Sequence, residues 1–358
     1  MRKENLMLKY VLCISSTKFR GVETDTNGNK IRVYFMGAGA FAPPVLRAVC
    51  ACSDIELVGT ATQPDKAAGR KRILTSTPLG QWADANGIPC DRVVSVNTED
   101  FLEELRKLEP DLVVVVSFGQ ILKQPILDAP RYGCLNVHAS ILPRYRGASP
   151  IASAILNGDE ETGVTFMQME RGLDSGPMYA IDRMPIPAGI TTEALEKQLA
   201  EMAGRRIAEV IRDIIHDARK PVPQPENGVT IATKIRKVDG SVDWTEDAAL
   251  IERRIRAYAK WPNTRFCFSG KDRPVQVRIT SATATAWSPA GEPGKILSMP
   301  NGKRQLMVKC GNGALLIERV LPEGKKEMTV ADFINGAHLN VGDMLLNGPD
   351  KLPVQAND

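Results

Sequence analysis

The sequence predicts an α/β protein in which a parallel sheet forms a first domain and a smaller, strand-rich domain follows it. From Ile31 onward, short apolar segments alternate with helix-like stretches, as they do where helices connect parallel strands. Residues 220–228 contain three prolines and a glycine, which exclude regular structure and predict an extended linker. The segments beyond this linker alternate between apolar and polar residues, which is typical of antiparallel strands.

Five short apolar segments are expected to form the strands of the first sheet. They are residues 33–36, 56–60, 112–117, 133–138 and 164–169. The segment 111–117 is apolar on both faces, as expected of a central parallel strand that helices cover on either side. A long helix follows this sheet, capped by Thr191 or Thr192 and running to about Asp217. The second domain is expected to contain one helix and the strands of a barrel, in residues 248–259, 275–279 and 314–320.

The chain of 358 residues exceeds one ordinary domain of roughly 150 residues, so we expect two domains. The expected divisions are an extension over residues 1–30, a first domain over 31–218, a linker over 219–233, a second domain over 234–345 and a tail over 346–358. The polar end of the extension predicts that this segment is disordered.

Composition excludes several classes of function. The chain is 43% hydrophobic and 25% charged, and it contains no run of 18 apolar residues, so we expect no membrane segment. Seven cysteines without a CxxC pair fit neither a disulfide framework nor a zinc site, and we interpret them as reduced thiols of a cytoplasmic protein. Only three histidines occur, at positions too far apart to share a helix face, so we expect no metal. The net charge of +4 is too small to identify a nucleic-acid partner.

A glycine motif lies where the first strand meets the first helix. Gly37, Gly39 and Ala42 match the Rossmann dinucleotide-binding pattern GxGxxG/A. The acidic residue that this pattern requires about 20 positions later is missing, and Asp65 lies in a loop instead. The glycines are better explained by a tight turn and close packing in a Rossmann-like domain. An NAD-dependent oxidoreductase stays an alternative that depends on Gly37 and Gly39 alone.

The strand over residues 133–138 ends with two polar side chains. Its period of two places Asn136 and His138 on one face and Leu135 and Val137 on the other. Ligands of open α/β sheets usually bind at the carboxyl ends of the strands. Asn136 and His138 are therefore candidates for a catalytic site.

Two loops add candidates that spacing alone leaves open. Residues 140–150 contain prolines and Gly147, so they form either an ordinary turn or a loop whose backbone can bind a flat heterocycle. Asp174 lies between Gly172 and Gly176, where an aspartate is either a turn residue or a functional carboxylate held by a bent loop.

Taken together, residues 136–147 (NVHASILPRYRG) and 172–176 (GLDSG) resemble the folate-dependent formyltransferase family. The resemblance implies a catalytic trio of Asn136, His138 and Asp174. It also implies that 10-formyltetrahydrofolate, the formyl donor, contacts the S-x-L-P segment, which is Ser140, Ile141, Leu142 and Pro143.

The residue types of this trio suit formyl transfer to an amine. Attack on the formyl carbon produces a tetrahedral centre with a negative oxygen, to which the Asn136 amide can donate. His138 can donate as a cation, or take the amine proton when neutral. Asp174 would favour the charged imidazole and hold its orientation.

Other segments resemble the branch of the family that formylates methionyl-initiator-tRNA for translation initiation. Residues 163–169 are similar to the corresponding strand of that branch, and the extra domain argues against the shorter purine-pathway enzymes. Residues 63–72 are similar to the insertion that grips the tRNA acceptor end, and four cations there can neutralise phosphates. These cations are Lys66, Arg70, Lys71 and Arg72.

The second domain resembles the OB-like tRNA-binding barrel of the same branch, through Asp243, Trp244, Trp261 and Pro262. The expected partners are therefore methionyl-initiator-tRNA and 10-formyltetrahydrofolate, and we expect a monomer that produces formylmethionyl-tRNA and tetrahydrofolate. The main alternative is a sugar-nucleotide formyltransferase acting on a UDP-amino-sugar. A tRNA-binding module without catalysis would have no reason to keep the trio.

The basic loop leads to the first prediction. The Arg70→Ala variant should use tRNA less efficiently, with a salt dependence shallower by about one unit of slope, because one phosphate contact is lost. Formylation kinetics measured over a range of salt concentrations test this prediction. Kinetics that match the parent at every salt concentration would show that the loop is ordinary solvated surface.

Overall fold

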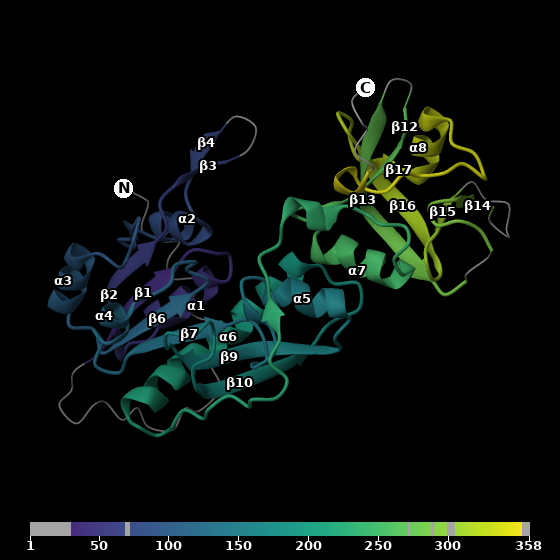
Figure 1. Ribbon diagram of the computed structural model, residues 1–358. Coiled ribbons are helices and arrows are strands. Elements are labelled where there is room, and N and C mark those ends of the chain that lie inside the picture. The colour runs from purple at the N-terminus through teal and green to yellow at the C-terminus, as the bar shows by residue number, and fades with distance from the viewer. Residues whose placement is uncertain (1–29, 69–71, 271–272, 288–289, 299–304, 353–358) are drawn as a thin grey trace, which may run out of the picture.

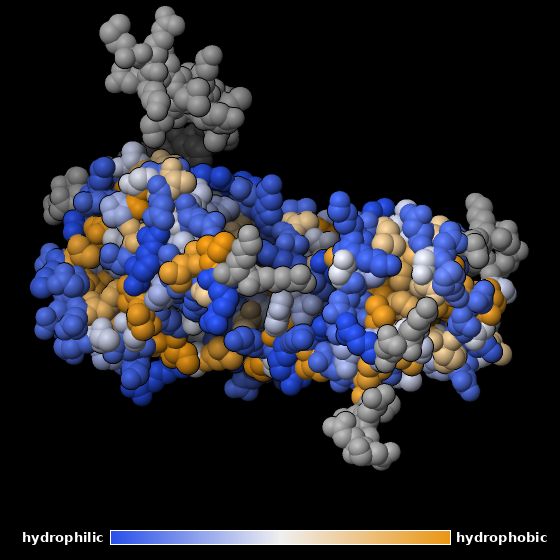
Figure 2. Space-filling view, turned by 90° about the horizontal axis from the view of Figure 1, so that it is seen from above, coloured by the Kyte–Doolittle hydropathy of each residue, from blue (hydrophilic) through white to orange (hydrophobic). Residues whose placement is uncertain are grey.

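The computed structural model describes residues 30–68, 72–270, 273–287, 290–298 and 305–352. The extension expected to be disordered, residues 1–30, lies outside the described residues except for Lys30. Two domains lie side by side along one axis, each with its own sheet (Figure 1). Hydrophilic residues cover much of the face seen in Figure 2. Within the described residues, no helix combines the length and apolar character that crossing a membrane requires.

The first domain is built on a seven-stranded sheet in the order β10-β9-β7-β6-β1-β2-β5. Its strands are β1 (Ile31–Gly37), β2 (Ile55–Thr62), β5 (Asp91–Arg92), β6 (Leu112–Val116), β7 (Cys134–His138), β9 (Glu161–Gln168) and β10 (Met178–Pro185). The pairs from β7 to β5 are parallel, so the carboxyl ends of these strands meet at one edge of the sheet.

The strand expected at residues 164–169 is present as β9, but the prediction of a parallel sheet is wrong at this strand. β9 runs antiparallel to β7, with Thr165 opposite His138, and β10 runs antiparallel to β9. The connection between β7 and β9 contains only one short helix of eight residues, and it begins and ends at the same edge of the sheet. Without a crossover to the opposite edge, the next strand must run in the reverse direction. The sheet is therefore mixed.

Helices cover both faces of this sheet. They are α1 (Ala42–Cys50), α2 (Pro78–Ala85), α3 (Glu99–Lys107), α4 (Gln124–Leu127), α5 (Pro150–Asn157) and α6 (Thr192–Ile215). The long helix is confirmed as α6, and the Thr191 side chain caps it by accepting from the backbone N–H of Ala194. β6 is buried throughout, and Val114 and Val115 belong to hydrophobic clusters on opposite faces. This confirms the expected central strand.

The second domain is a curled antiparallel sheet with two helices and its own apolar core (Figure 1). Its strands are β12 (Thr264–Ser269), β13 (Pro274–Thr285), β14 (Ile296–Leu297), β15 (Leu306–Lys309), β16 (Ala314–Pro322) and β17 (Met328–Thr329). Its helices are α7 (Ala248–Ala257) and α8 (Val330–Ala337), with 3-10 turns at Lys237–Gly240 and Pro349–Lys351. Trp244 is buried in this core, where it packs on Phe266. The expected helix and strands thus occur as α7, β13 and β16.

The segment expected to be a linker is extended and bonded to the first domain. Val222 forms an antiparallel bridge with Met178. Further along, β11 (Ile231–Ala232) pairs in parallel with β8 (Arg146–Gly147). The linker therefore passes over the loop that follows β7.

Helix α7 joins the second domain to the first. The Arg253 Nε donates to the carbonyl oxygen of Leu156 at the end of α5, at 2.8 Å. The Thr192 hydroxyl donates to the carbonyl oxygen of Ala257, also at 2.8 Å. Both contacts use the carbonyl groups at helix ends, which have no partner within their own helix. At the other end of the second domain, the expected tail begins at residue 346, and Leu346 exchanges backbone hydrogen bonds with Cys267.

The ion pair between Asp54 and Arg212 links the start of β2 to α6 and leads to a prediction. The two side chains make bidentate hydrogen bonds of 2.6 and 2.8 Å. The Arg212 guanidinium holds the pKa of the Asp54 carboxyl below its ordinary value of 3.8. A carboxyl whose pKa is lowered by folding stabilises the fold above its unfolded pKa and loses this effect as pH falls through its folded pKa.

The Asp54→Asn variant should therefore be less stable near pH 7, by about 1 kcal/mol because the pair is partly solvent-exposed. Its deficit should shrink as the pH falls below the ordinary value of 3.8. Denaturant unfolding at a series of pH values measures this difference. The Glu201→Gln change, in the more exposed pair with Arg47, is the control and should cost less. A deficit that stays constant down to the lowest pH would contradict an electrostatic origin.

Candidate functional site

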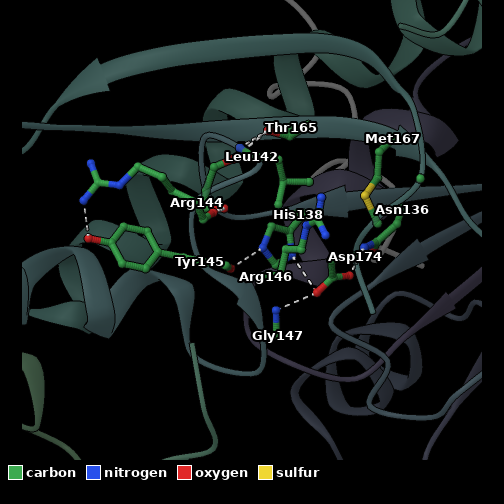
Figure 3. A network of polar contacts seen from close by, with 12 residues as sticks. Asn136, His138, Leu142, Arg144, Tyr145, Arg146, Gly147, Thr165, Met167 and Asp174 are labelled. Atoms are coloured by element: carbon green, nitrogen blue, oxygen red, sulfur yellow. Dashed lines mark hydrogen bonds and ion pairs between the residues drawn. The ribbon is translucent and has the colours of Figure 1, made fainter. Parts of the chain in front are cut away.

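Three polar side chains meet at the carboxyl edge of the sheet, where β7 ends (Figure 3). Asn136 and His138 project from the same face of β7, as their spacing predicts. Asp174 comes from the loop between β9 and β10, which leaves β9 beside the start of β7 and folds back to reach Asn136. The structure therefore brings together the three residues that the sequence proposes as a trio.

The Asp174 carboxylate is the centre of this arrangement. Its Oδ1 accepts from Asn136 Nδ2 at 3.2 Å, and its Oδ2 accepts from the backbone N–H of Gly147 at 2.8 Å. The same Oδ2 lies 3.7 Å from His138 Nδ1, and both side chains are largely buried. Asp174 adopts a left-handed backbone conformation, with φ of +46°, that glycine, asparagine and aspartate enter more often than other residues but that still costs free energy in a residue with a Cβ atom. The loop is thus held in a strained shape that aims its carboxylate at the other two residues.

The two ring nitrogens of His138 have different surroundings. Nε2 lies 2.9 Å from the carbonyl oxygen of Tyr145, which can only accept, so Nε2 carries a hydrogen. Nδ1 faces Asp174. A neutral His138 therefore has its lone pair on Nδ1, and a protonated one presents an N–H to the carboxylate. Nδ1 is the nitrogen left to exchange a proton.

The carbonyl that orients His138 is fixed by a polar network around Tyr145, whose ring points away from the trio (Figure 3). The Tyr145 hydroxyl donates to Asp159 Oδ2 at 2.7 Å and accepts from Arg144 Nη2 at 2.7 Å and Asn157 Nδ2 at 3.0 Å. Burial of the hydroxyl, the larger cause, and the hydrogen bond to Asp159, the next, raise the pKa of Tyr145 to about 12. The hydroxyl consequently stays protonated and keeps its donor role.

The residues proposed for folate contact lie in the loop directly after β7. They are Ser140, Ile141, Leu142 and Pro143. Ser140 and Leu142 are buried, whereas Ile141 and Pro143 are partly exposed. The Thr165 hydroxyl donates to the Ser140 carbonyl at 2.7 Å and accepts from the Leu142 N–H at 3.1 Å. This loop is therefore held against β9, and only part of it can face a ligand.

The linker contributes a residue that sequence reasoning missed. Gln224 reaches both the Asp174 loop and Arg146, through hydrogen bonds to the Asp174 carbonyl and to the guanidinium. The sequence contains a weak signal for it, because Gln224 is a polar residue between Pro223 and Pro225. A segment that serves only as a spacer does not require this residue type.

The basic loop follows β2 and forms a hairpin of β3 (Lys66–Ala68) and β4 (Ile73–Thr75), which projects beyond the body of the first domain (Figure 1). Arg70 and Lys71 lie outside the described residues. Lys66 and Arg72 are exposed, as is the pair Ile73 and Leu74. Since β2 and β7 are parallel strands of one sheet, this hairpin rises from the same edge as the trio.

The glycines of the first turn allow close packing. A Cβ atom on Gly37 would lie 2.8 Å from the Ala42 Cβ, and one on Gly39 would lie 3.1 Å from the Ser117 Cβ. Neither distance is compatible with a larger residue unless its neighbours shift. Close packing thus explains why glycine occupies these two positions, without a bound dinucleotide. Among the described residues, no group of three or more His, Cys, Asp or Glu side chains is arranged to hold a metal ion.

Comparisons with known families cover both domains. The family model described as formyl transferase matches residues 29–211, and the model of the formyl transferase C-terminal domain matches residues 234–338.

Two bacterial relatives are similar over nearly their whole length. The methionyl-tRNA formyltransferase of Halorhodospira halophila is 41% identical over 312 residues, which are 87% of this chain and 98% of that protein. The methionyl-tRNA formyltransferase of Methylococcus capsulatus is 41% identical over 315 residues, which are 88% and 99% of the two chains.

Solved structures share the fold at lower identity. An N-formyltransferase from Helicobacter canadensis, in complex with folinic acid and dTDP-3-aminofucose, has a TM-score of 0.56 at 17% identity and covers 80% of this chain and 98% of its own. The sugar 3N-formyl transferase WlaRD has a TM-score of 0.56 at 17% identity, over 84% of this chain and all (100%) of its own.

Gly147 leads to a prediction about the integrity of this site. Its φ is +113°, and a Cβ atom there would lie 2.7 Å from the carbonyl oxygen of Ala232 in the linker. The Gly147→Ala change should push β8 away from β11 and move the N–H that Asp174 accepts. We expect a loss of stability of about 2–3 kcal/mol, measured by denaturant unfolding.

Gly189→Ala is the matched control, because Gly189 also has a positive φ, of +72°, but a Cβ atom there meets nothing within 4 Å. The control variant should lose only about 1 kcal/mol of stability, from backbone strain alone. Equal losses in the two variants would show that contact with the linker contributes nothing at Gly147.

Proposed function

The chain belongs to the methionyl-tRNA formyltransferase family, and from this premise we propose that it transfers a formyl group from 10-formyltetrahydrofolate to methionyl-initiator-tRNA. The products are formylmethionyl-tRNA, which serves translation initiation, and tetrahydrofolate. The observation that carries the proposal is the convergence of Asn136, His138 and Asp174 at the carboxyl edge of the sheet.

Asn136 stabilises the tetrahedral intermediate. The methionyl amine attacks the formyl carbon, a C–N bond forms, and the formyl oxygen becomes negative. One amide hydrogen of Asn136 is used by Asp174, and its second amide hydrogen is directed to this oxygen. A donor of this kind contributes about 3 kcal/mol to the transition state.

His138 moves the proton. In the neutral form its Nδ1 lone pair takes the proton that the attacking amine must lose. When the bond between the formyl carbon and the folate nitrogen breaks, this proton passes to the departing nitrogen. The Tyr145 carbonyl keeps Nε2 occupied throughout, so the ring does not need to turn during the exchange.

Asp174 stabilises the imidazolium that exists between these two transfers. Its carboxylate lies 3.7 Å from Nδ1 in a largely buried site, where the attraction between opposite charges is stronger than in water. The hydrogen bonds from Asn136 and Gly147 keep the carboxylate in place before and after the ring is charged.

The formyl donor binds beside the trio, against the loop that carries Ser140 to Pro143. The partly exposed Ile141 and Pro143 supply the apolar contact of this loop with the flat folate ring. Ser140 and Leu142 hold its shape from within the domain.

The acceptor tRNA contacts a basic surface outside the catalytic trio. Lys66 and Arg72 bind its phosphates together with Arg70 and Lys71, which lie between them in the sequence. The exposed Lys66 and Arg72, on an edge shared with the trio, support this assignment. The second domain, over residues 234–345, serves as an OB-like tRNA-binding barrel behind the linker of residues 219–233. Its separate core and curled antiparallel sheet are consistent with that role.

A sugar-nucleotide acceptor is the second candidate. The solved structures with similar folds include sugar N-formyltransferases, but they are only 17% identical to this chain. A sugar nucleotide also has no use for the projecting basic hairpin. The tRNA acceptor is therefore preferred.

A direct assay tests the proposal. The protein is mixed with 10-formyltetrahydrofolate and charged initiator tRNA, and the formylated aminoacyl-tRNA is followed over time. We expect product at catalytic enzyme concentrations. No product, together with transfer of the formyl group to a UDP-amino-sugar, would overturn the proposed acceptor.

The His138→Ala variant tests the mechanism in the same assay. We expect kcat to fall by about 10²- to 10⁴-fold, because the proton acceptor is lost. The His216→Ala variant is the control, since His216 is exposed at the end of α6. Near-normal turnover by a folded His138→Ala protein would remove His138 from the mechanism.

A further inference from the structure

Gln224 lies at the centre of the contacts between the linker and the catalytic loops. Its Nε2 donates to the carbonyl oxygens of Asp174 and Gly176, both at 2.8 Å. Its Oε1 accepts from Arg146 Nε at 3.0 Å and from Nη2 at 2.7 Å. Gln224 is partly buried although the residues around it in the linker, Pro223 and Pro225, are exposed.

These four hydrogen bonds use the whole capacity of a primary amide, which has two donor hydrogens and two acceptor lone pairs. The two donors hold the Asp174 loop, and the acceptor oxygen holds the loop after β7 through Arg146. One side chain therefore fixes the distance between two loops that are far apart in the sequence. The same two loops are also joined directly by the hydrogen bond from the Gly147 N–H to the Asp174 carboxylate.

The Asp174 loop needs this support because of its backbone conformation. Asp174 has φ of +46°, a strained geometry that persists only where the surroundings hold it. Its carbonyl is held by Gln224 while its carboxylate faces Asn136 and His138. A rotation of this peptide would carry the carboxylate away from both partners.

We propose that Gln224 is a positioning residue for formyl transfer, which clamps the Asp174 loop to Arg146 and so holds the catalytic carboxylate beside His138. The inference rests on the proposed function, in which Asp174 stabilises the charged ring. Gln224 itself touches neither substrate. The linker therefore takes part in the active site as well as connecting the two domains.

Two substitutions at this position separate the donor bonds from the acceptor bonds. Gln224→Leu removes all four hydrogen bonds. Gln224→Glu retains the pairing with Arg146 but loses both donors and places a negative oxygen against the carbonyls of Asp174 and Gly176. Glu226→Ala, at an exposed position two residues later in the linker, is the matched control.

We expect kcat to fall by about 10- to 100-fold in both Gln224 variants, as a displacement of a catalytic group by about 1 Å would produce. KM for the tRNA and for the formyl donor should stay within about threefold of the parent, and Glu226→Ala should behave as the parent. Thermal unfolding checks that each variant is folded. Parental kcat in a folded Gln224→Glu protein would overturn the proposal, because Arg146 would then be the only partner that matters.

A double-mutant cycle with Asp174→Ala shows whether Gln224 acts through the carboxylate, with single-turnover measurements at high enzyme concentration to quantify slow variants. Adding Gln224→Leu to Asp174→Ala should cause no further loss of rate, because there is no carboxylate left to position. Full additivity of the two losses would overturn the proposal and indicate a general structural role.

The same cycle distinguishes failure of this inference from failure of the proposed function. Normal turnover by Asp174→Ala alone would contradict the catalytic trio. A slow Asp174→Ala protein beside a normal Gln224→Leu protein would contradict the positioning role only.

Discussion

The carboxylate of Asp174 is the constraint on which the active site depends. It accepts hydrogen bonds from a strand residue, Asn136, and from a loop backbone, at Gly147, and it faces the Nδ1 of His138. These groups come from two segments of the chain, β7 and β8, and Asp174 itself comes from a third. A largely buried charge is stable only when it has hydrogen-bond partners or an opposite charge nearby. The carboxylate therefore also holds together the segments that supply these partners.

The fold provides this arrangement through a loop that folds back along β7. Because β9 runs antiparallel to β7, it ends beside Cys134 at the start of β7, and the loop that follows β9 must turn back toward the carboxyl end to bring Asp174 to Asn136 and His138. The linker then crosses both catalytic loops before it reaches the second domain. Its contacts hold the linker against the surroundings of the trio, as the bonds of Gln224 to Arg146 illustrate.

Much of the fold follows from local patterns in the sequence. The segment 111–117, which is apolar on both faces, forms the buried strand β6. Thr191 caps α6, as its residue type and position indicate. The direction of β9 does not follow in this way. Its apolar pattern is equally compatible with either direction, and the difference depends on the path of the chain between β7 and β9.

The alternation of residues along β7 was sufficient to place Asn136 and His138 on one face, because side-chain direction in a strand depends only on position along it. Spacing alone leaves Asp174 ambiguous between a turn residue and a functional carboxylate, and only the resemblance to the formyltransferase family favours the carboxylate. Tertiary structure alone decided which nitrogen of His138 faces Asp174, and that Gln224 bonds both to Arg146 and to the Asp174 loop. These contacts join residues separated by tens of positions, and no local preference of the backbone specifies such pairs.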